Sequence, residues 1–411
     1  TLNTTGDVRL GDSVETVNFG TLIFDTNNLT LTESSSMELG ASTAQGNVVL
    51  TTTTGAITDI GPLEIAGDTT LSSGAFSITL DEANDFQGLV NLSNSGANTV
   101  ILNDAVGTFT LGNVNLGQDL LLTTSGLTGL GTGVVGRDLR VTNTIAGIED
   151  SGSGLAAGRY VELLTSGDNS LISLTGTTAA SGFAMLTSGL NSNATVNTPM
   201  EAILLDPAAG TGLTEAVNVT GTFSLTGNDI QILGPVQTGV DLNIDFNSET
   251  EGGDGLLLLN DDLAAGGAIN LNVDNGVTPT DQPVNAFGTI YADRTEGLVL
   301  NASTITAGQN EILASVNGDL LLTTSGDLSI GDLNSTGTIN LQVGGDLNIN
   351  ARVLRASGLT EGDAGADFVS GDPTVEPIIN MTGFNLDTSI QPTVFLGTGT
   401  RDYTRAADTQ K

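Results

Sequence analysis

The chain of 411 residues contains no cysteine and no histidine, and only one lysine. Without cysteine it can have neither a disulfide framework nor a thiolate metal site. Without histidine it lacks Ser-His-Asp and Cys-His catalysis and His-ligated zinc. No apolar run approaches the roughly 18 residues that suggest a transmembrane helix, and extended windows with apolar residues at i, i+3, i+4 and i+7 are absent. These absences favour an all-β chain without the usual catalytic groups.

Positive charge is also scarce, because 47 acidic residues stand against 10 basic ones and give a net charge of −37. Such a surface repels phosphate and anionic headgroups, so we expect neither nucleic acid nor membrane insertion. The first hundred residues hold a single cation, Arg9, whereas five cations follow residue 351. Four of these are candidates for an end-to-end assembly interface, with a solvated C-terminal cap as the simpler interpretation: Arg352, Arg355, Arg401 and Arg405.

The chain is rich in one repeated phrase. The stretches Gly117–Gly131 and Gly318–Gly331 both read as an aspartate, a Leu-Leu-Leu strand, a Thr-Thr-Ser-Gly turn and a second short strand. Related Gly-(x)-Asp/Asn-Leu/Val starts fall at Gly46, Gly67, Gly117, Gly136, Gly158, Gly239, Gly318 and Gly345. Their separations are close to multiples of about 20 residues, the length of one coil of a parallel β-solenoid.

We therefore predict an all-β fold, a right-handed parallel β-helix (β-solenoid) that forms a single elongated rod with coils of about 20–25 residues. The β-helix is expected over residues 1–350, with irregular loops near 181–217 and 273–288. Residues 351–411 are expected to form a divergent C-terminal segment, either a cap or an assembly interface. An antiparallel meander is the alternative, disfavoured because Asn-Gly and Asp-Gly hairpin turns are few.

Carboxylates are the remaining candidates for chemistry. Asn260-Asp261-Asp262 is superficially similar to the aspartate cluster of polygalacturonase-type enzymes, which hold two carboxylates about 6.5–9.5 Å apart. Those enzymes also use histidine and a basic motif, so we interpret these aspartates as turn caps and expect no catalytic residue. Glu251–Gly255 is similar to one unit of a calcium β-roll, which works only in tandem copies. Calcium thus remains a weak prediction at Asp254, Asp261 and Asp262, and no other cofactor is expected.

Part of the chain resembles a known family. The residues that carry the resemblance are Leu63–Leu71, Ile78–Gly96 and Phe109–Val114. They are similar to the repeats of filamentous-haemagglutinin-like, β-strand-repeat giant bacterial exoproteins, which are adhesins. Residues 46–145 follow the pattern well, 295–350 follow it in part, and about 180–290 depart from it. The resemblance implies a right-handed parallel β-helix exported to the cell surface of a Gram-negative bacterium, where adhesion or matrix building is the usual role.

From these observations we expect a structural, non-enzymatic, extracellular β-solenoid segment of a bacterial surface adhesin or fibre, processed or excised from something longer. One alternative is a self-assembling extracellular filament or matrix subunit joined end to end. A second is a β-helix carbohydrate-active enzyme. The expected partners are other copies or adjacent repeats of a longer chain, and a host or neighbouring-cell surface or carbohydrate.

Overall fold

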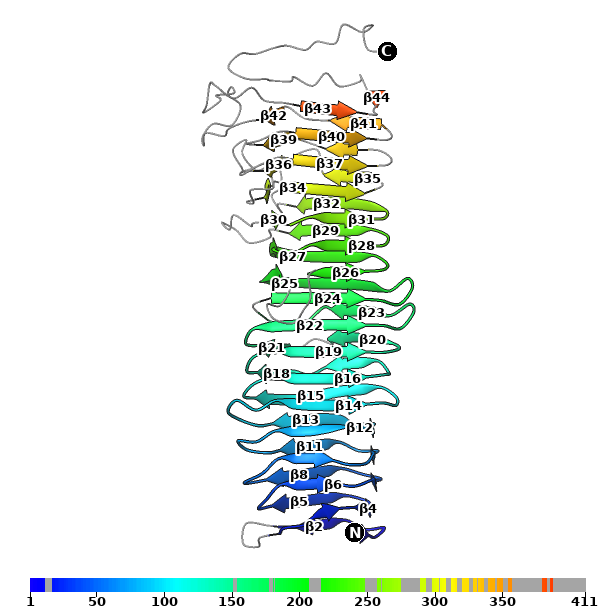
Figure 1. Cartoon of the computed structure of the whole chain (residues 1–411), viewed down its shortest axis with the longest axis vertical. Helices are drawn as coiled ribbons and strands as arrows, with labels where there is room; N and C mark the ends of the chain where they lie inside the picture. Colours follow the sequence, from blue (N-terminus) through cyan, green and yellow to red (C-terminus); the bar gives the residue numbers. More distant parts are fainter. Residues whose placement is uncertain are drawn as a thin grey trace, which may run out of the picture. The chain divides into compact units, whose positions relative to one another are not determined.

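The strands of this chain pair in parallel, coil upon coil (Figure 1). The computed structural model describes residues 1–11, 17–150, 154–176, 180, 182–206, 216–247, 257–259, 261–274, 289–292, 298–302, 304–307, 312–315, 320–324, 328–330, 332–335, 339–343, 346–349, 354–356, 379–382 and 385–386. Side chains are described up to residue 271, except 198–202, 228–229, 246–247 and 257–259. Within these residues no helix is long and apolar enough to cross a membrane.

Two compact units divide the chain, Thr1–Thr195 and Val196–Lys411, with the boundary inside β25 (Asn193–Leu205). In the first unit, three columns of strands are linked by parallel pairing. Column 1 contains β2 (Val8–Leu10), β5 (Leu29–Glu33), β8 (Val48–Thr52), β11 (Thr69–Ser72), β13 (Leu89–Ser93), β15 (Phe109–Leu116), β18 (Thr132–Val135) and β21 (Leu155–Ala157).

Column 2 contains β3 (Thr21–Leu22), β6 (Met37–Leu39), β9 (Ile57–Asp59), β12 (Ile78–Phe86), β14 (Val100–Asp104), β16 (Leu120–Thr124), β19 (Leu139–Asn143), β22 (Tyr160–Thr165) and β24 (Gly182–Thr187). Column 3 contains β1 (Leu2–Asn3), β4 (Phe24–Thr26), β7 (Ser42–Ala44), β10 (Leu63–Ile65) and the end of β12. From the first residues of β15 onward, a further series of strands runs in line: β17 (Thr128–Leu130), β20 (Gly147–Asp150) and β23 (Leu171–Leu174).

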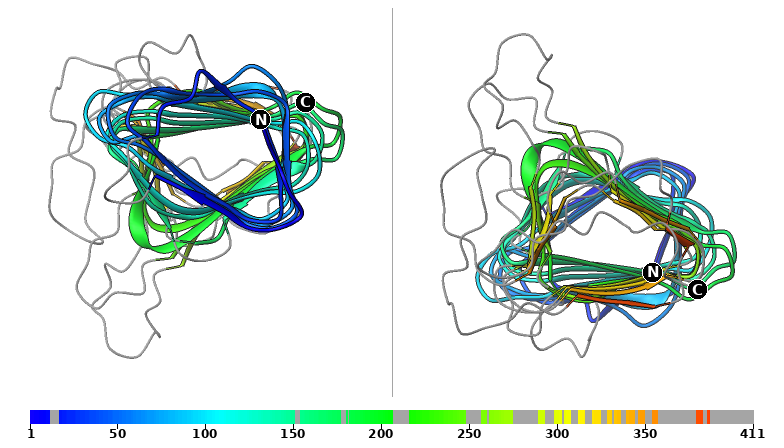
Figure 2. Two further views of the ribbon diagram at one scale, coloured as in Figure 1. Left: turned by 90° about the horizontal axis from the view of Figure 1, so that it is seen from below. Right: turned by 90° about the horizontal axis from the view of Figure 1, so that it is seen from above.

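The core consists of aliphatic ladders inside the coils, whose outline is three-sided when seen end-on (Figure 2). In β5 the burial alternates, and Leu29 and Leu31 are fully buried while the threonines between them face outward. Leu29 lies opposite Val48 and Leu31 opposite Leu50, so one coil stacks its apolar residues on those of the next. Each such side chain, when fully buried, stabilises the fold by about 1.5–3 kcal/mol.

Coil length in this unit is close to the predicted one. Val48 pairs with Thr69 and Thr69 with Val90, which gives 21 residues per coil. Leu120 pairs with Leu139, which gives 19. A parallel β-solenoid with coils of about 20 residues is therefore confirmed for the first unit.

The repeated Gly-x-Asp/Asn phrase forms corners at which coils touch. Gly67 sits on Gly46, and a β-carbon at Gly67 would lie 2.5 Å from the carbonyl carbon of Gly46. Next to this contact, the Oδ1 of Asn47 accepts a hydrogen bond from the backbone N–H of Asp68 at 2.9 Å. Asp68 does the same one coil later, accepting from the N–H of Leu89 at 3.0 Å. Glycine allows the close approach, and the Asx side chain satisfies the backbone donor that the corner leaves over.

A second corner uses the same phrase at a different place in the coil. The strands that follow Gly46 and Gly67 belong to column 1, but those that follow Gly117 and Gly136 belong to column 2. A β-carbon at Gly136 would lie 2.6 Å from the carbonyl carbon of Gly117. The phrase therefore marks a close-packed corner, but not one fixed corner.

The second unit has three columns of its own. The first contains β26 (Val217–Val219), β28 (Val236–Thr238), β31 (Leu263–Ala265), β34 (Leu298–Ala302), β37 (Leu320–Thr324), β40 (Ile339–Val343) and β43 (Ile379–Thr382). The next contains β27 (Phe223–Ile232), β29 (Leu242–Asn247), β32 (Ala268–Asp274), β35 (Thr304–Ala307), β38 (Leu328–Ile330), β41 (Asp346–Ile349) and β44 (Asn385–Leu386). The third starts at the end of β27 and contains β30 (Leu257–Leu259), β33 (Thr289–Ala292), β36 (Ile312–Ser315), β39 (Asp332–Ser335) and β42 (Leu354–Ala356).

The phrase at Gly318–Gly331 supplies β37 and β38 of this unit. Leu320 pairs with Leu298 on one side and with Ile339 on the other, so the predicted stacking of equivalent leucine positions is confirmed. Some coils are longer than predicted, since Val236 pairs with Leu263, 27 residues on.

The loop predicted over 181–217 differs in part from the structure. Six residues of β24 pair in register with β22, and β25 follows, so much of this stretch is strand. The Ala/Gly-rich composition suggested a loop, but pairing with a preformed neighbouring strand outweighs weak local propensity. Residues 207–215 and most of 273–288 lie outside the described residues, as does most of 351–411.

Candidate functional site

Two parallel rows of side chains face outward from column 3. Residues two apart on a strand point to the same side of a sheet, so each strand contributes one residue to each row. The apolar row contains Ile23, Ala41, Pro62, Ala83 and Val106. The acidic row contains Asn3, Asp25, Thr43, Glu64 and Asp85. Together the rows line a groove with a volume of about 600 Å³, within the range of small-molecule sites.

Strand register fixes the order of the acidic row. Asp25 lies opposite Thr43, Thr43 opposite Glu64, and Glu64 opposite Asp85. Thr43 donates a hydrogen bond to Asp25 at 3.1 Å, and the side-chain amide of Gln87 donates to Asp85 at 2.9 Å. Neighbouring strands are about 4.8 Å apart, so Glu64 and Asp85 are adjacent like charges. Among the described side chains no cation pairs with either of them.

The apolar row is unusually exposed for aliphatic side chains. Ile23 is 40% exposed and Val106 is 55% exposed, whereas the inward residue Phe24 is buried. An apolar strip beside a strip of uncompensated acids can hold a ligand that is apolar on one side and cationic on the other.

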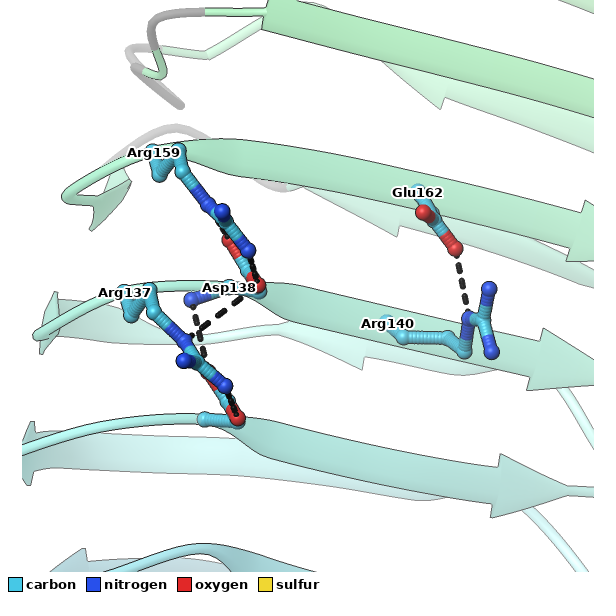
Figure 3. A network of polar contacts seen from close by, with 6 residues as sticks. Arg137, Asp138, Arg140, Arg159 and Glu162 are labelled. Atoms are coloured by element: carbon cyan, nitrogen blue, oxygen red, sulfur yellow. Dashed lines mark hydrogen bonds and ion pairs between the residues drawn. The ribbon is translucent and has the colours of Figure 1, made fainter. Parts of the chain in front are cut away.

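A second polar cluster lies on β16, β19 and β22 and the corners before them (Figure 3). The Arg137 guanidinium binds both oxygens of Asp119, with Nε–Oδ1 at 2.7 Å. Arg159 binds Asp138 in the same way, with Nε–Oδ1 at 2.8 Å. The hydrogen bond from Arg159 lowers the pKa of Asp138. Each arginine thus ties one coil to the previous one.

A third pair completes this cluster. The Nε of Arg140 donates to Oε2 of Glu162 at 2.5 Å, across β19 and β22. The guanidinium of Arg159 lies 5.0 Å from the centre of the Tyr160 ring, within cation–π range. The three arginines are therefore engaged in contacts between coils or beside the corner, and each is about half exposed. Half-exposed pairs of this kind contribute little stability individually.

Polar side chains also line the interior at the ends of column 2 strands. Asn143 donates from Nδ2 to the hydroxyls of Thr124 and Thr128, both at 3.0 Å. Its Oδ1 accepts from the backbone N–H groups of Ile145 and Ala146 at 3.1 and 2.8 Å. The amide thereby satisfies the turn that follows its own strand, which is a structural use of a buried polar group.

Asp104 lies one rung before Thr124 in this interior row and is fully buried. Its Oδ1 accepts a hydrogen bond from the N–H of Phe86 at 2.8 Å, while its Oδ2 has no partner. Burial raises the pKa of Asp104 to about 7. Asp59 is also buried and its pKa is raised by burial, although the Asn84 amide donates to it at 2.8 Å.

The predicted site residues do not converge in the described part of the chain. Asp261 accepts a hydrogen bond at Oδ1 from the N–H of Asp262 at 2.7 Å, as in the turn-capping interpretation. Asp254 lies outside the described residues, and within the searched residues no group of three acidic side chains is placed to hold a metal ion. Calcium binding at these three aspartates stays a prediction.

The candidate interface arginines cannot be placed as side chains. Arg352, Arg401 and Arg405 lie outside the described residues. Arg355 belongs to β42 and its backbone pairs with that of Asn334. The assembly role of these four residues stays a prediction.

Sequence reasoning missed both the groove and the arginine ladder. The groove has a faint signal, an apolar or small residue two positions before an acid, at Ile23–Asp25, Pro62–Glu64 and Ala83–Asp85. The ladder has another, arginine directly after the corner glycine at Gly136–Arg137 and Gly158–Arg159. Neither signal has meaning until strand register shows which residues are neighbours.

Comparison with known proteins gives one result. Residues 26–93 match a family described as repeats of unknown function (DUF5649). This stretch runs from β4 to β13 and includes most of the groove. No curated protein and no solved structure matches the chain.

Proposed function

We propose that this chain is a structural, non-enzymatic β-solenoid segment of a bacterial adhesin or fibre, exposed outside the cell on a Gram-negative surface. The observation that carries the proposal is the use of the polar side chains. The corner residues Asn47, Asp68 and Asp119 each bind the following coil. Repetition of this kind builds length, because each coil rests on its neighbours and adds the same contacts again.

Two further observations support the proposal. The stretch that resembles the repeats of surface adhesins, 46–145, overlaps the stretch that matches a repeat family, 26–93. The strongly negative chain, with a net charge of −37, also suits a protein that must stay soluble as an extended surface structure.

Saturable binding to cells tests the adhesive role. Fluorescently labelled chain is incubated with epithelial cells and with Gram-negative cells, and unlabelled chain or polyglutamate of equal charge is added as competitor. We expect saturable binding that the unlabelled chain displaces and polyglutamate does not. Absence of saturable binding, or equal competition by polyglutamate, would contradict adhesion. Release of reducing ends from a panel of acidic polysaccharides would contradict the non-enzymatic part.

A second candidate function is a filament or matrix subunit joined end to end. It is favoured by the uneven cations, with one in the first hundred residues and five after residue 351. Sedimentation velocity at 50 mM and 500 mM NaCl tests it with the variant R401Q/R405Q. Concentration-dependent growth at low salt that the variant abolishes supports assembly, and a monomer under all conditions excludes it.

A further inference from the structure

We propose that the groove on column 3 binds an extended cationic polypeptide segment in which basic and apolar side chains alternate. The inference goes beyond the structural role, since it needs only the first unit and applies to the isolated chain in solution. It rests on the two rows that line the groove, not on the number of acids alone.

The geometry of the groove suits an extended chain. The acidic row runs over five rungs from Asn3 to Asp85, which is about 19 Å at ~4.8 Å per rung. About six extended residues span this length at ~3.3 Å each. The two rows are separated by two residues along each strand, or roughly 6.6 Å. A chain lying between them would direct successive side chains alternately to the apolar row and to the acidic row.

Charge selects a cationic occupant. Glu64 and Asp85 are directly opposite each other without a compensating cation among the described residues, and like charges in this position destabilise a sheet. A lysine or arginine from a partner would relieve that repulsion. Because no group of three acids among the searched residues is placed to ligate a metal ion, the cation is better supplied by side chains than by a metal.

The apolar row distinguishes a polypeptide from a simple polycation. Ile23 and Val106 remain largely exposed at two positions along the groove, and covering them removes apolar surface from water. A polyamine could neutralise the acids but would leave this row uncovered. Aliphatic side chains between the basic ones would cover it.

Binding to three blocked hexapeptides tests the inference. The peptides alternate lysine with valine, lysine with serine, or glutamate with valine, and affinity for the whole chain is measured by calorimetry at 50 mM NaCl. We expect the lysine–valine peptide to bind at least about threefold more tightly than the lysine–serine peptide, corresponding to partial burial of the apolar row. The glutamate–valine peptide should not bind.

Matched variants separate the groove from general charge attraction. E64Q removes one acid of the groove, and E149Q removes an exposed acid from a strand of the β17–β20–β23 series. We expect E64Q to weaken lysine–valine binding about threefold, the scale of an exposed ion pair, and E149Q to have no effect. I23T should weaken only the lysine–valine peptide, whereas V134T, at an exposed valine elsewhere, should not.

Three outcomes would overturn the inference. Equal losses in E64Q and E149Q would mean that binding is nonspecific attraction to an acidic protein. Equal affinities of the lysine–valine and lysine–serine peptides would remove the role of the apolar row. Binding of spermine as tight as that of the lysine–valine peptide, and equally sensitive to E64Q, would make the occupant a polyamine. Circular dichroism of each variant verifies that the β-structure is intact.

Discussion

The buried carboxyl of Asp104 should make the stability of this protein fall between pH 5.5 and 7, and D104N should remove that fall. Asp104 is fully buried with one oxygen unpartnered, and its pKa is raised to about 7. In the unfolded chain an aspartate titrates near pH ~3.9. Above pH 5.5 the unfolded chain has lost this proton while the folded protein keeps it. Folding therefore takes up a proton, and stability is lost as the pH rises through the folded pKa.

The size of the effect follows from proton linkage. A difference of one bound proton changes the free energy of unfolding by about 1.4 kcal/mol per pH unit, or about 2 kcal/mol between pH 5.5 and 7. Above pH 7 the dependence should level off. The window is favourable because the chain has no histidine, so few ordinary groups titrate within it.

Urea denaturation followed by far-ultraviolet circular dichroism at pH 5.5, 6.5, 7.5 and 8 measures the effect. Asparagine keeps the acceptor for the N–H of Phe86 and has no charge to desolvate. We expect D104N to be the more stable protein at pH 8, with a difference from wild type that shrinks by about 2 kcal/mol at pH 5.5. E149Q serves as the control at an exposed acid. D59N identifies the share of Asp59, whose raised pKa acts in the same direction.

Two results would refute this reasoning. A wild-type stability that is constant between pH 5.5 and 8 would mean that Asp104 is ionised or solvated in the fold. A slope that persists in D104N, and is removed in D59N instead, would assign the proton to the other buried carboxyl.

Three further predictions concern the contacts between coils, each measured as a change in urea midpoint at pH 7. G67A should destabilise the protein by about 1–3 kcal/mol, because its β-carbon would meet the backbone of the previous coil, whereas G20A, with nothing within 4 Å, should be nearly neutral; equal effects would contradict the stacking argument. N143A should cost about 2–3 kcal/mol, since it leaves buried hydroxyls and two turn N–H groups without partners, and T142A at the neighbouring, less buried position serves as control. R137A should cost only about 0.5–1 kcal/mol because its ion pair is half exposed, and a loss above about 3 kcal/mol would show that the pair is effectively buried.

The coil could be predicted because its cause is local. Gly67 and Asp68 stand together in the sequence, and the same two residues make the close contact and the hydrogen bond between coils. Alternating apolar residues then place the strand in the core without further information. This is why the repeated phrase predicted the fold class and the coil length.

The groove and the buried acids depend on register instead. Glu64 and Asp85 are 21 positions apart, and only strand pairing makes them neighbours. Asp104 ends its strand as an ordinary turn residue would, and its burial follows from a bulge between Leu80 and Asn84 on the adjacent strand. A single sequence does not indicate such a bulge, so the raised pKa could not be foreseen.

The stacked corners have a consequence for how such a chain changes length. Because Val48 pairs with Thr69 and Thr69 with Val90, each separated by 21 positions, duplication of one whole period would place every glycine on a glycine and every leucine on a leucine. Insertion of an odd number of residues within a strand would instead turn its apolar side chains to solvent. The gene can therefore lengthen or shorten this protein freely only in steps of a complete period.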